Sequence, residues 1–253
     1  MILIAHRVHP DLPLVVAANR DEFYARPTAS AHFWHGPEGM LAGKDLEAGG
    51  TWLGVDERGR FAAVTNVGEP PSSGTKLSRG ALVQDFLRGQ SSAQPYAAQI
   101  EGERYRGFNL LLWDGESLIY TSNRSDTVKL AAGVYGLANA SLNEDRHKVG
   151  RGKAALAAAV AQEGANAELN PALLALLADR EAPATAEGRK IPGRSAAELI
   201  SMGACFIVGS DYGTRASTAV AVGHAEVHFS EQIYIEGGLA KGRSQHRMLR
   251  RRD

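Results

Sequence analysis

The sequence predicts an α+β fold. Apolar, β-rich runs fill most of residues 1–140 and 204–237, whereas the Ala- and Leu-rich helical pattern is concentrated in residues 147–180. Because strands and helices are segregated along the chain, antiparallel sheets are expected in place of alternating βα units. A chain of 253 residues can bury a substantial core, and we expect one domain spanning residues 1–253.

The strand-rich regions are expected to form hairpins. The clearest signal is GFNLLLWDGESLIYTSNR, where Asp114-Gly115 forms a favoured two-residue turn between apolar runs. A Gly-rich stretch through residue 50 is expected to be irregular. The other expected strands are 2–8 and 14–18 around the turn HPDLP, 51–55 and 60–67 around DERG, GVYGLANAS, and two to four strands within 204–238.

Helices are expected where polar caps precede helical patterns. Ser78 is expected to cap a helix over 79–87 that stops at Gly89, and Asn170 to cap the second of two helices within 147–180, which Pro171 opens. Shorter helices are expected around 96–101 and at AAELISM.

Composition excludes several classes of function. Lys plus Arg and Asp plus Glu are 28 each, so no broad attraction to nucleic acid or to anionic membranes is expected. The basic tail, Arg247 and Arg250 to Arg252, is interpreted as a solvated or frayed end, with a phosphate-binding tail as the alternative. No run of about 18 apolar residues or secretory signal is found, so we expect a cytoplasmic protein without stable membrane insertion.

Candidate site residues follow apolar runs. The run LVVAA is followed at once by Asn19, Arg20, Asp21 and Glu22, which would be costly to bury unpaired. Amides after strands can point donors at one oxyanion, although a single Asn is more often a turn former. We therefore expect one ligand-binding pocket for a small molecule, lined by Asn19, Arg20, Asp21, Glu22, Asn66, Asn139 and Arg215.

Four segments carry a family resemblance: AANRDEFYARPT, GGTWLGVDERGRFAAVTNV, GVYGLANASLNEDRHKVGRGK and YGTRASTAVAV, which together span residues 14–222. They resemble the NRDE family, also called the transport and Golgi organization protein 2 family. That family is similar in pattern to N-terminal nucleophile (Ntn) hydrolases of the bile-salt and penicillin V acylase type. The resemblance implies an αββα sandwich of two antiparallel sheets flanked by helices.

The resemblance also implies roles for residues. Asn66 matches the oxyanion-hole Asn, Asn139 the second pocket Asn, and Arg215 the late pocket Arg, while Arg20, Asp21 and Glu22 fall where those acylases place an Arg and an Asp beside the nucleophile. Such acylases use an N-terminal cysteine whose α-amino group is the general base. This chain instead has Ile2 after Met1, and its single cysteine, Cys205, lies in an apolar run where an inert thiol is expected.

Two functions remain open. One is a non-enzymatic carrier of a hydrophobic small molecule, for which the family suggests haem or an acyl lipid, with His9 or His35 as the available axial ligand. The other is an amide or acyl hydrolase whose cysteine comes from a different start. No cofactor is required, His32 and His35 lack a third zinc ligand, and the oligomeric state is left open.

Overall fold

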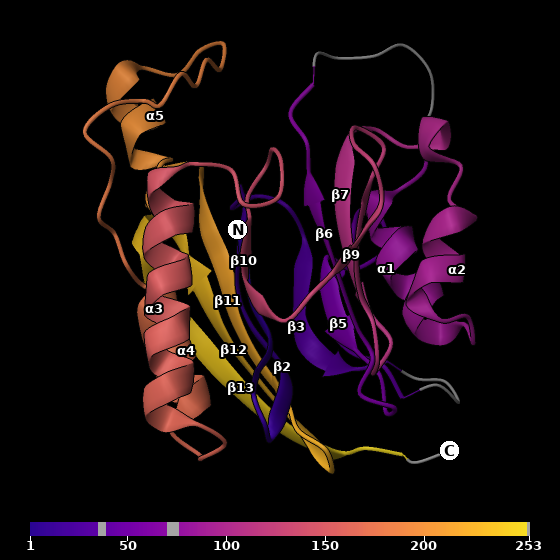
Figure 1. Ribbon diagram of the computed structural model, residues 1–253. Coiled ribbons are helices and arrows are strands. Elements are labelled where there is room, and N and C mark those ends of the chain that lie inside the picture. Colours follow the sequence, from indigo (N-terminus) through magenta and orange to yellow (C-terminus); the bar gives the residue numbers. More distant parts are fainter. Residues whose placement is uncertain (35–38, 70–75, 252–253) are drawn as a thin grey trace. The chain divides into compact units, whose positions relative to one another are not determined.

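The computed structural model describes residues 1–34, 39–69 and 76–251 (Figure 1). Two compact units share the chain, and each is built from interleaved segments. Unit 1 comprises Met1–Arg26, Ala132–Ala138 and Leu142–Arg247, and unit 2 comprises Pro27–Ala131, Asn139–Ser141 and Met248–Asp253.

Unit 1 is built on a six-stranded sheet in the order β10-β1-β2-β11-β12-β13. Helices α3 and α4 lie along one face of this sheet (Figure 1), where their leucines pack against small and branched residues of the strands. The elements are β1 (Ile2–His9), β2 (Leu12–Phe23), β10 (Gly133–Leu137), α3 (His147–Glu163), α4 (Leu169–Leu177), α5 (Ala196–Ser201), β11 (Tyr212–Val222), β12 (Glu226–Ile235), the 3-10 turn η2 (Glu236–Gly238) and β13 (Leu239–Leu249), whose last two residues belong to unit 2.

Unit 2 is built on a seven-stranded antiparallel meander in which each strand pairs with the next along the chain. Helices α1 and α2 cover one face (Figure 1). Phe86 and Leu87 of α1 pack against residues of the central strands. The elements are β3 (Thr28–Phe33), β4 (Leu41–Asp45), β5 (Leu53–Val55), β6 (Phe61–Asn66), α1 (Arg79–Arg88), α2 (Ala93–Ala98), the 3-10 turn η1 (Gly102–Arg104), β7 (Phe108–Trp113), β8 (Leu118–Ser122) and β9 (Val128–Leu130).

The predicted fold class is confirmed: the protein is α+β, with two antiparallel sheets and flanking helices. The hairpins β1–β2, β5–β6 and β7–β8 lie where the turn signals placed them. The stretch through residue 50 was wrongly expected to be irregular, because it contains β3 and β4. Short strands rich in Gly, Ala and charged residues carry a weak β pattern, which explains the error.

The helices occur as expected, but two of the expected caps are wrong. Ser78 precedes α1 without a side-chain capping bond, and Asn170 lies inside α4, where its amide reaches Ser230 Oγ at 3.1 Å. The short helix expected around 96–101 begins earlier, at Ala93. At α5, Ser195 and Glu198 form a reciprocal capping box.

The C-terminal region also differs from the prediction. Residues around Cys205 form an irregular segment in place of a strand, and a long strand, β13, follows η2. The basic tail is not frayed where it is described. Arg250 Nε donates to Arg58 O at 3.0 Å, and Arg251 pairs with Glu57 at 2.9 Å. These contacts fix the tail on the β5–β6 turn within unit 2.

Candidate amino-terminal site

The four polar residues Asn19 to Glu22 lie inside β2, which continues to Phe23. Successive side chains of a strand point to opposite faces of the sheet. Asn19 and Asp21 therefore share the face covered by α3 and α4, while Arg20 and Glu22 share the other face. The motif is one continuous run in sequence but serves both faces of the sheet.

Asn19 ties three parts of unit 1 together. Its amide nitrogen donates to the carbonyls of Leu177 and Cys205, at 2.9 Å each, and its amide oxygen accepts a 2.6 Å bond from Ser217 Oγ. Asn19 and Ser217 are both buried. Because every polar atom of this amide has a partner, Asn19 anchors the end of α4 and the segment around Cys205 to the centre of the sheet.

The amino group of Met1 lies beside this anchor. It donates to Asn19 O at 2.8 Å and lies 3.9 Å from Asp21 Oδ2. Asp21 Oδ1 in turn accepts a 2.7 Å bond from Thr214 Oγ1 on β11. Burial lowers the pKa of the Met1 amine, and the negative charge of Asp21 opposes that shift. Because the net shift of its pKa is downward, the Met1 amine loses its proton at a lower pH than an exposed amino terminus does.

A second buried amine belongs to Lys148, in the first turn of α3. Its Nζ donates to Met202 O at 3.3 Å. Burial lowers the pKa of Lys148, Asp21 raises it, and the positive charge of Arg189 lowers it further. One carboxylate, Asp21, thus stabilises two buried amines. We call the group formed by Met1, Asn19, Asp21, Lys148, Thr214 and Ser217 the amino-terminal cluster.

Cys205 borders the cluster but has an inert thiol. Its Sγ lies 3.6 Å from Leu177 O, and burial raises the pKa of the thiol to about 12. At neutral pH the sulfur is therefore protonated, so it has little nucleophilic or metal-binding capacity.

The opposite face of β2 carries a row of charges. The Arg20 guanidinium lies 3.6 Å from Glu22 Oε2, and the Arg26 Nε lies 3.9 Å from the same oxygen. The Arg20 side chain is almost buried, whereas those of Glu22 and Arg26 are about a quarter exposed. This row, Arg20–Glu22–Arg26, presents positive charge on both sides of one carboxylate.

Arg215 sits at an irregularity in the pairing of β11 with β2. Thr214 pairs with Asp21 and Ala216 with Arg20, so Arg215 is an extra residue without a partner position. Its Nη1 donates to the carbonyls of Phe23, Tyr24 and Arg26, at 2.8, 3.0 and 3.1 Å. Arg215 therefore holds the turn that follows β2.

Exposed apolar side chains gather at this end of the six-stranded sheet. The Tyr212↔Phe23 and Ala216↔Ile233 pairings place the end of β2, the start of β11 and the end of β12 together. Phe23 is 50% exposed and meets Tyr212 edge to face at 5.3 Å. Ile235 and Leu239, on either side of η2, are 44% and 63% exposed. We call Phe23, Ile235 and Leu239 the apolar rim.

The two predicted asparagines of the later motifs meet in unit 2. Asn139 Nδ2 donates to Asn66 O at 3.0 Å. Beside them, buried Asn109 donates to Ala140 O at 2.6 Å and to Thr65 Oγ1 at 3.3 Å, while Tyr120 OH donates to Asn109 Oδ1. These bonds hold residues 139–141 against the sheet of unit 2. The structure thus groups the expected site residues in two sets, one in each unit.

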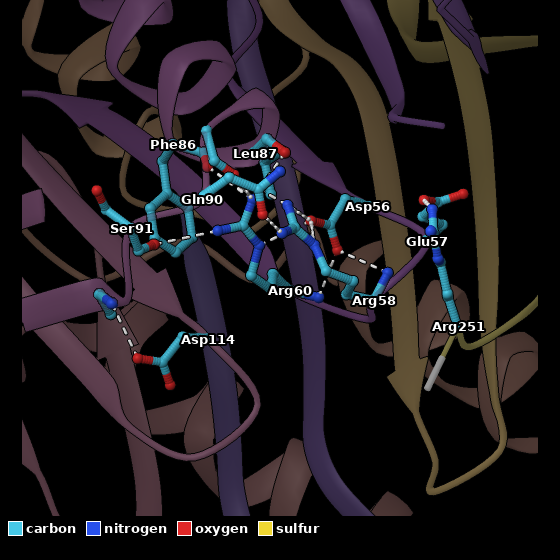
Figure 2. A network of polar contacts seen from close by, with 12 residues as sticks. Asp56, Glu57, Arg58, Arg60, Phe86, Leu87, Gln90, Ser91, Asp114 and Arg251 are labelled. Carbon is cyan, nitrogen blue, oxygen red and sulfur yellow. Dashed lines mark hydrogen bonds and ion pairs between the residues drawn. The ribbon is translucent and has the colours of Figure 1, made fainter. Parts of the chain in front are cut away.

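The DERGR part of the second motif is structural. Asp56 accepts bonds from Arg58 and Arg60, and Arg60 Nη2 also donates to carbonyls at the end of α1 (Figure 2). The Arg60 guanidinium lies over the Phe86 ring, 4.7 Å from its centre. The motif therefore joins the β5–β6 turn to the C-terminal end of α1, whose carbonyls lack helical partners.

The candidate ligand histidines that the structure describes make local contacts. His9 Nδ1 accepts from Asp11 N at 3.2 Å, and His32 stacks on Trp34, while His35 lies outside the described residues. Residues 1–34, 39–69 and 76–251 contain no group of three or more His, Cys, Asp or Glu arranged to hold a metal ion. In the same ranges no helix is both long and apolar enough to cross a bilayer.

Sequence reasoning missed Lys148, Thr214, Ser217 and Asn109. A signal existed for Lys148: it lies on the buried stripe of α3 with Gly152, Leu156 and Val160, at a spacing of four residues. A lysine on such a stripe must find buried partners. Thr214, Ser217 and Asn109 lie within strands where hydroxyls and amides are common, so their sequence context carries no comparable signal.

The chain is similar to several curated proteins over most of its length. It is 38% identical to the transport and Golgi organization protein 2 homolog of Bos taurus, covering 88% of this chain and 87% of that protein. It is 35% identical to the Homo sapiens homolog, covering 90% and 88%, and 28% identical to the Drosophila melanogaster protein of that name, covering 87% and 85%.

Among solved structures, the chain is similar to a mutant conjugated bile acid hydrolase from Clostridium perfringens, with a TM-score of 0.44, 8% identity and coverage of 90% of this chain and 88% of that one. The family model described as Transport and Golgi organisation 2 matches residues 1–236. The resemblance first noted in four sequence segments is therefore confirmed, and the chain belongs to the Transport and Golgi organisation 2 family.

Proposed function

We propose that this protein binds and carries a hydrophobic small molecule with an anionic group, of which haem and long-chain acyl acids are the two candidates. The observation that supports this is the apolar rim. Phe23 exposes half of its surface at the end of β2, and Ile235 and Leu239 expose comparable fractions at the same end of the sheet. Exposed apolar side chains at one end of a sheet are a feature of binding surfaces.

The charge row, which lies on the opposite face of β2 from Phe23 and ends at Arg26 in the turn after that strand, supplies the complement for an anion. Glu22 is flanked by the guanidinium groups of Arg20 and Arg26. A carboxylate of the ligand would pair with the partly exposed Arg26, since guanidinium groups bind carboxylates well. An acyl chain or a porphyrin ring would cover Phe23.

The amino-terminal cluster supports binding over covalent chemistry. The hydroxyls of Thr214 and Ser217 are buried and donate to Asp21 and Asn19, and the Cys205 thiol is protonated at neutral pH because burial raises its pKa to about 12. In this role the cluster fixes the strand ends that carry the apolar rim.

Titration of the full chain with haem, followed by its Soret band, and with a fluorescent long-chain fatty acid tests the proposal. Phe23→Ser is expected to weaken binding at least about tenfold, because burying an aromatic side chain contributes about 1.5–3 kcal/mol to the binding free energy. Phe33→Ser is the matched control, since Phe33 is 45% exposed on β3 of unit 2. No binding of either ligand, or equal losses in both variants, would contradict the proposal.

A second candidate function is amide or acyl hydrolysis, and the Met1 amine favours it. This group is buried, its pKa is lowered by burial, and it lies beside Asp21, as a general base at a chain terminus would. The nucleophile would be a cysteine at the start of β1.

Variants that carry a new N-terminal residue test the hydrolase candidate. In Ile2→Cys the initiator methionine is expected to be removed, which leaves a cysteine with a free α-amine, while Ile2→Ala is processed in the same way without gaining a thiol. Both proteins would be assayed on a panel of N-acyl amides. Hydrolysis by Ile2→Cys alone would support the hydrolase candidate, and equal rates in the two variants would reject it.

A further inference from the structure

The outer strand of the unit 1 sheet, β13, presents a long edge. It runs from Leu239 to Leu249, pairs with β12 on one side, and is the last strand in the described sheet order. Of its eleven residues, eight are exposed, Ser244 and His246 are half-buried and one is buried. Backbone groups on the outer side of such a strand have no strand partner, so an edge of this length is a template for pairing.

The edge is strongly basic although the whole chain has zero formal charge. Lys241, Arg243 and Arg247 lie on β13, and residues 239–249 include no Asp or Glu. Arg247 pairs with Glu226 of β12. Lys241 and Arg243 form no ion pair with any residue in the described ranges. The uncompensated charge is therefore centred on these two side chains.

Alternation places these charges in one row. Lys241, Arg243 and Arg247 occupy odd positions with Leu239, so all four point to the same face, while Ser244 and His246 point to the other face and are less exposed. Leu239 is 63% exposed. The edge thus presents an apolar residue followed by a basic centre along one side.

We propose that β13 docks an extended, acidic segment of a partner protein, which adds to the sheet as a seventh strand. Carboxylates at alternate positions of that segment would face Lys241 and Arg243, because opposite charges across neighbouring strands stabilise the pairing. An apolar residue at one end of it would cover Leu239. Backbone hydrogen bonds supply affinity and the alternating side chains supply selectivity.

A second copy of this chain fits the edge poorly. Antiparallel pairing of two β13 strands would place lysine and arginine side chains against one another, and like charges directly opposite are destabilising. An anionic membrane offers charge but no strand to pair with the backbone groups of the edge. Charge and backbone together therefore favour an acidic peptide segment.

The test uses the full chain and three labelled peptides of nine residues, followed by fluorescence anisotropy. One peptide alternates Glu and Val, the second has the same composition with its Glu residues grouped at one end, and the third alternates Lys and Val. Binding is expected for the first peptide alone. The double variant Lys241→Glu, Arg243→Glu is expected to lose at least about tenfold in affinity, and Lys241→Arg, Arg243→Lys to retain it.

Controls separate the alternative occupants. A matched charge reversal away from the edge, at Lys129 on β9 of unit 2, is expected to leave peptide binding unchanged. Thermal unfolding of each variant checks that the fold is intact. Equal binding of the grouped and alternating peptides, binding only to vesicles containing phosphatidylserine, concentration-dependent dimerisation that excludes the peptide, or no binding at all would each overturn the proposal.

Discussion

Arg60 Nε lies 2.7 Å from Asp56 Oδ2 in the interior of unit 2, and both side chains are almost fully buried. The remaining guanidinium nitrogens of Arg60 donate to the carbonyls of Phe86, Leu87, Gly89 and Ser91 (Figure 2). A single side chain therefore connects a β-turn to the end of α1. Removing either partner leaves the other charge buried without compensation.

Arg60→Met is expected to lower the free energy of unfolding by about 3–5 kcal/mol, the usual cost of breaking a buried ion pair from one side. Urea denaturation measures it. Arg58→Met is the matched control: Arg58 shares the Asp56 carboxylate, but its side chain is 20% exposed, so a loss of about 1 kcal/mol or less is expected. Equal losses in the two variants would show that the buried bonds to α1 contribute little.

Gly50→Ala is expected to destabilise the protein by about 1–3 kcal/mol, because the added methyl group would overpack a backbone contact. A Cβ atom at Gly50 would lie 2.5 Å from the carbonyl carbon of Gly80, which is backbone and cannot rotate away. Gly242→Ala is the control, since a Cβ there meets nothing within 4 Å. Thermal unfolding compares the two, and a neutral Gly50→Ala would mean that the start of α1 moves easily.

The Cys205 thiol is expected to make stability fall at alkaline pH. Its folded pKa is raised from 9.0 to about 12, so the folded state keeps a proton that the unfolded state releases. The associated stability is fully present below pH 9 and is lost as pH rises toward 12, with a slope of at most about 1.4 kcal/mol per pH unit. Cys205→Ala should lack this component when urea midpoints are compared at pH 8 and 10. Identical pH profiles would contradict it.

Lys148 is expected to act in the opposite sense. Burial lowers its folded pKa, so the unfolded state binds its proton more tightly and stability rises with pH toward the ordinary value of 10.5. Lys148→Met removes the group that titrates. The free energy of unfolding of the variant minus that of the wild-type protein should therefore be largest near neutral pH and should decrease toward pH 10.5. A difference between the two proteins that stays constant between pH 7 and 10 would show that Lys148 does not change protonation on unfolding.

Much of the fold could be predicted from the sequence, because turn chemistry and hydrophobic period determine local structure. Asp114-Gly115 located one hairpin, and the polar break between α3 and α4 separated two helices. Strands without such signals were missed. The sequence of β13 has no apolar alternation, and of its residues only Arg247 falls in the basic tail; its position beside β12 makes it a strand.

The site could be predicted only in part. Sequence identified Asn19 and Asp21 because charged and amide groups interrupt an apolar run, but it could not show that neighbouring letters of the motif face opposite sides of the sheet. The partners of Asp21, Thr214 and Lys148, lie more than 120 residues away. Such long-range pairings depend on strand register and helix docking, which no local pattern encodes.

The extra residue at Arg215 has a consequence for changes in chain length. Since Thr214 already stands opposite Asp21 and Ala216 opposite Arg20, removing the single position between them would leave both pairings in place. Shortening β11 by one residue at any neighbouring position would transpose every side chain beyond it to the wrong side. A one-residue deletion in β11 is therefore best tolerated at Arg215. That deletion would remove the hydrogen bonds that Arg215 donates to the turn after β2.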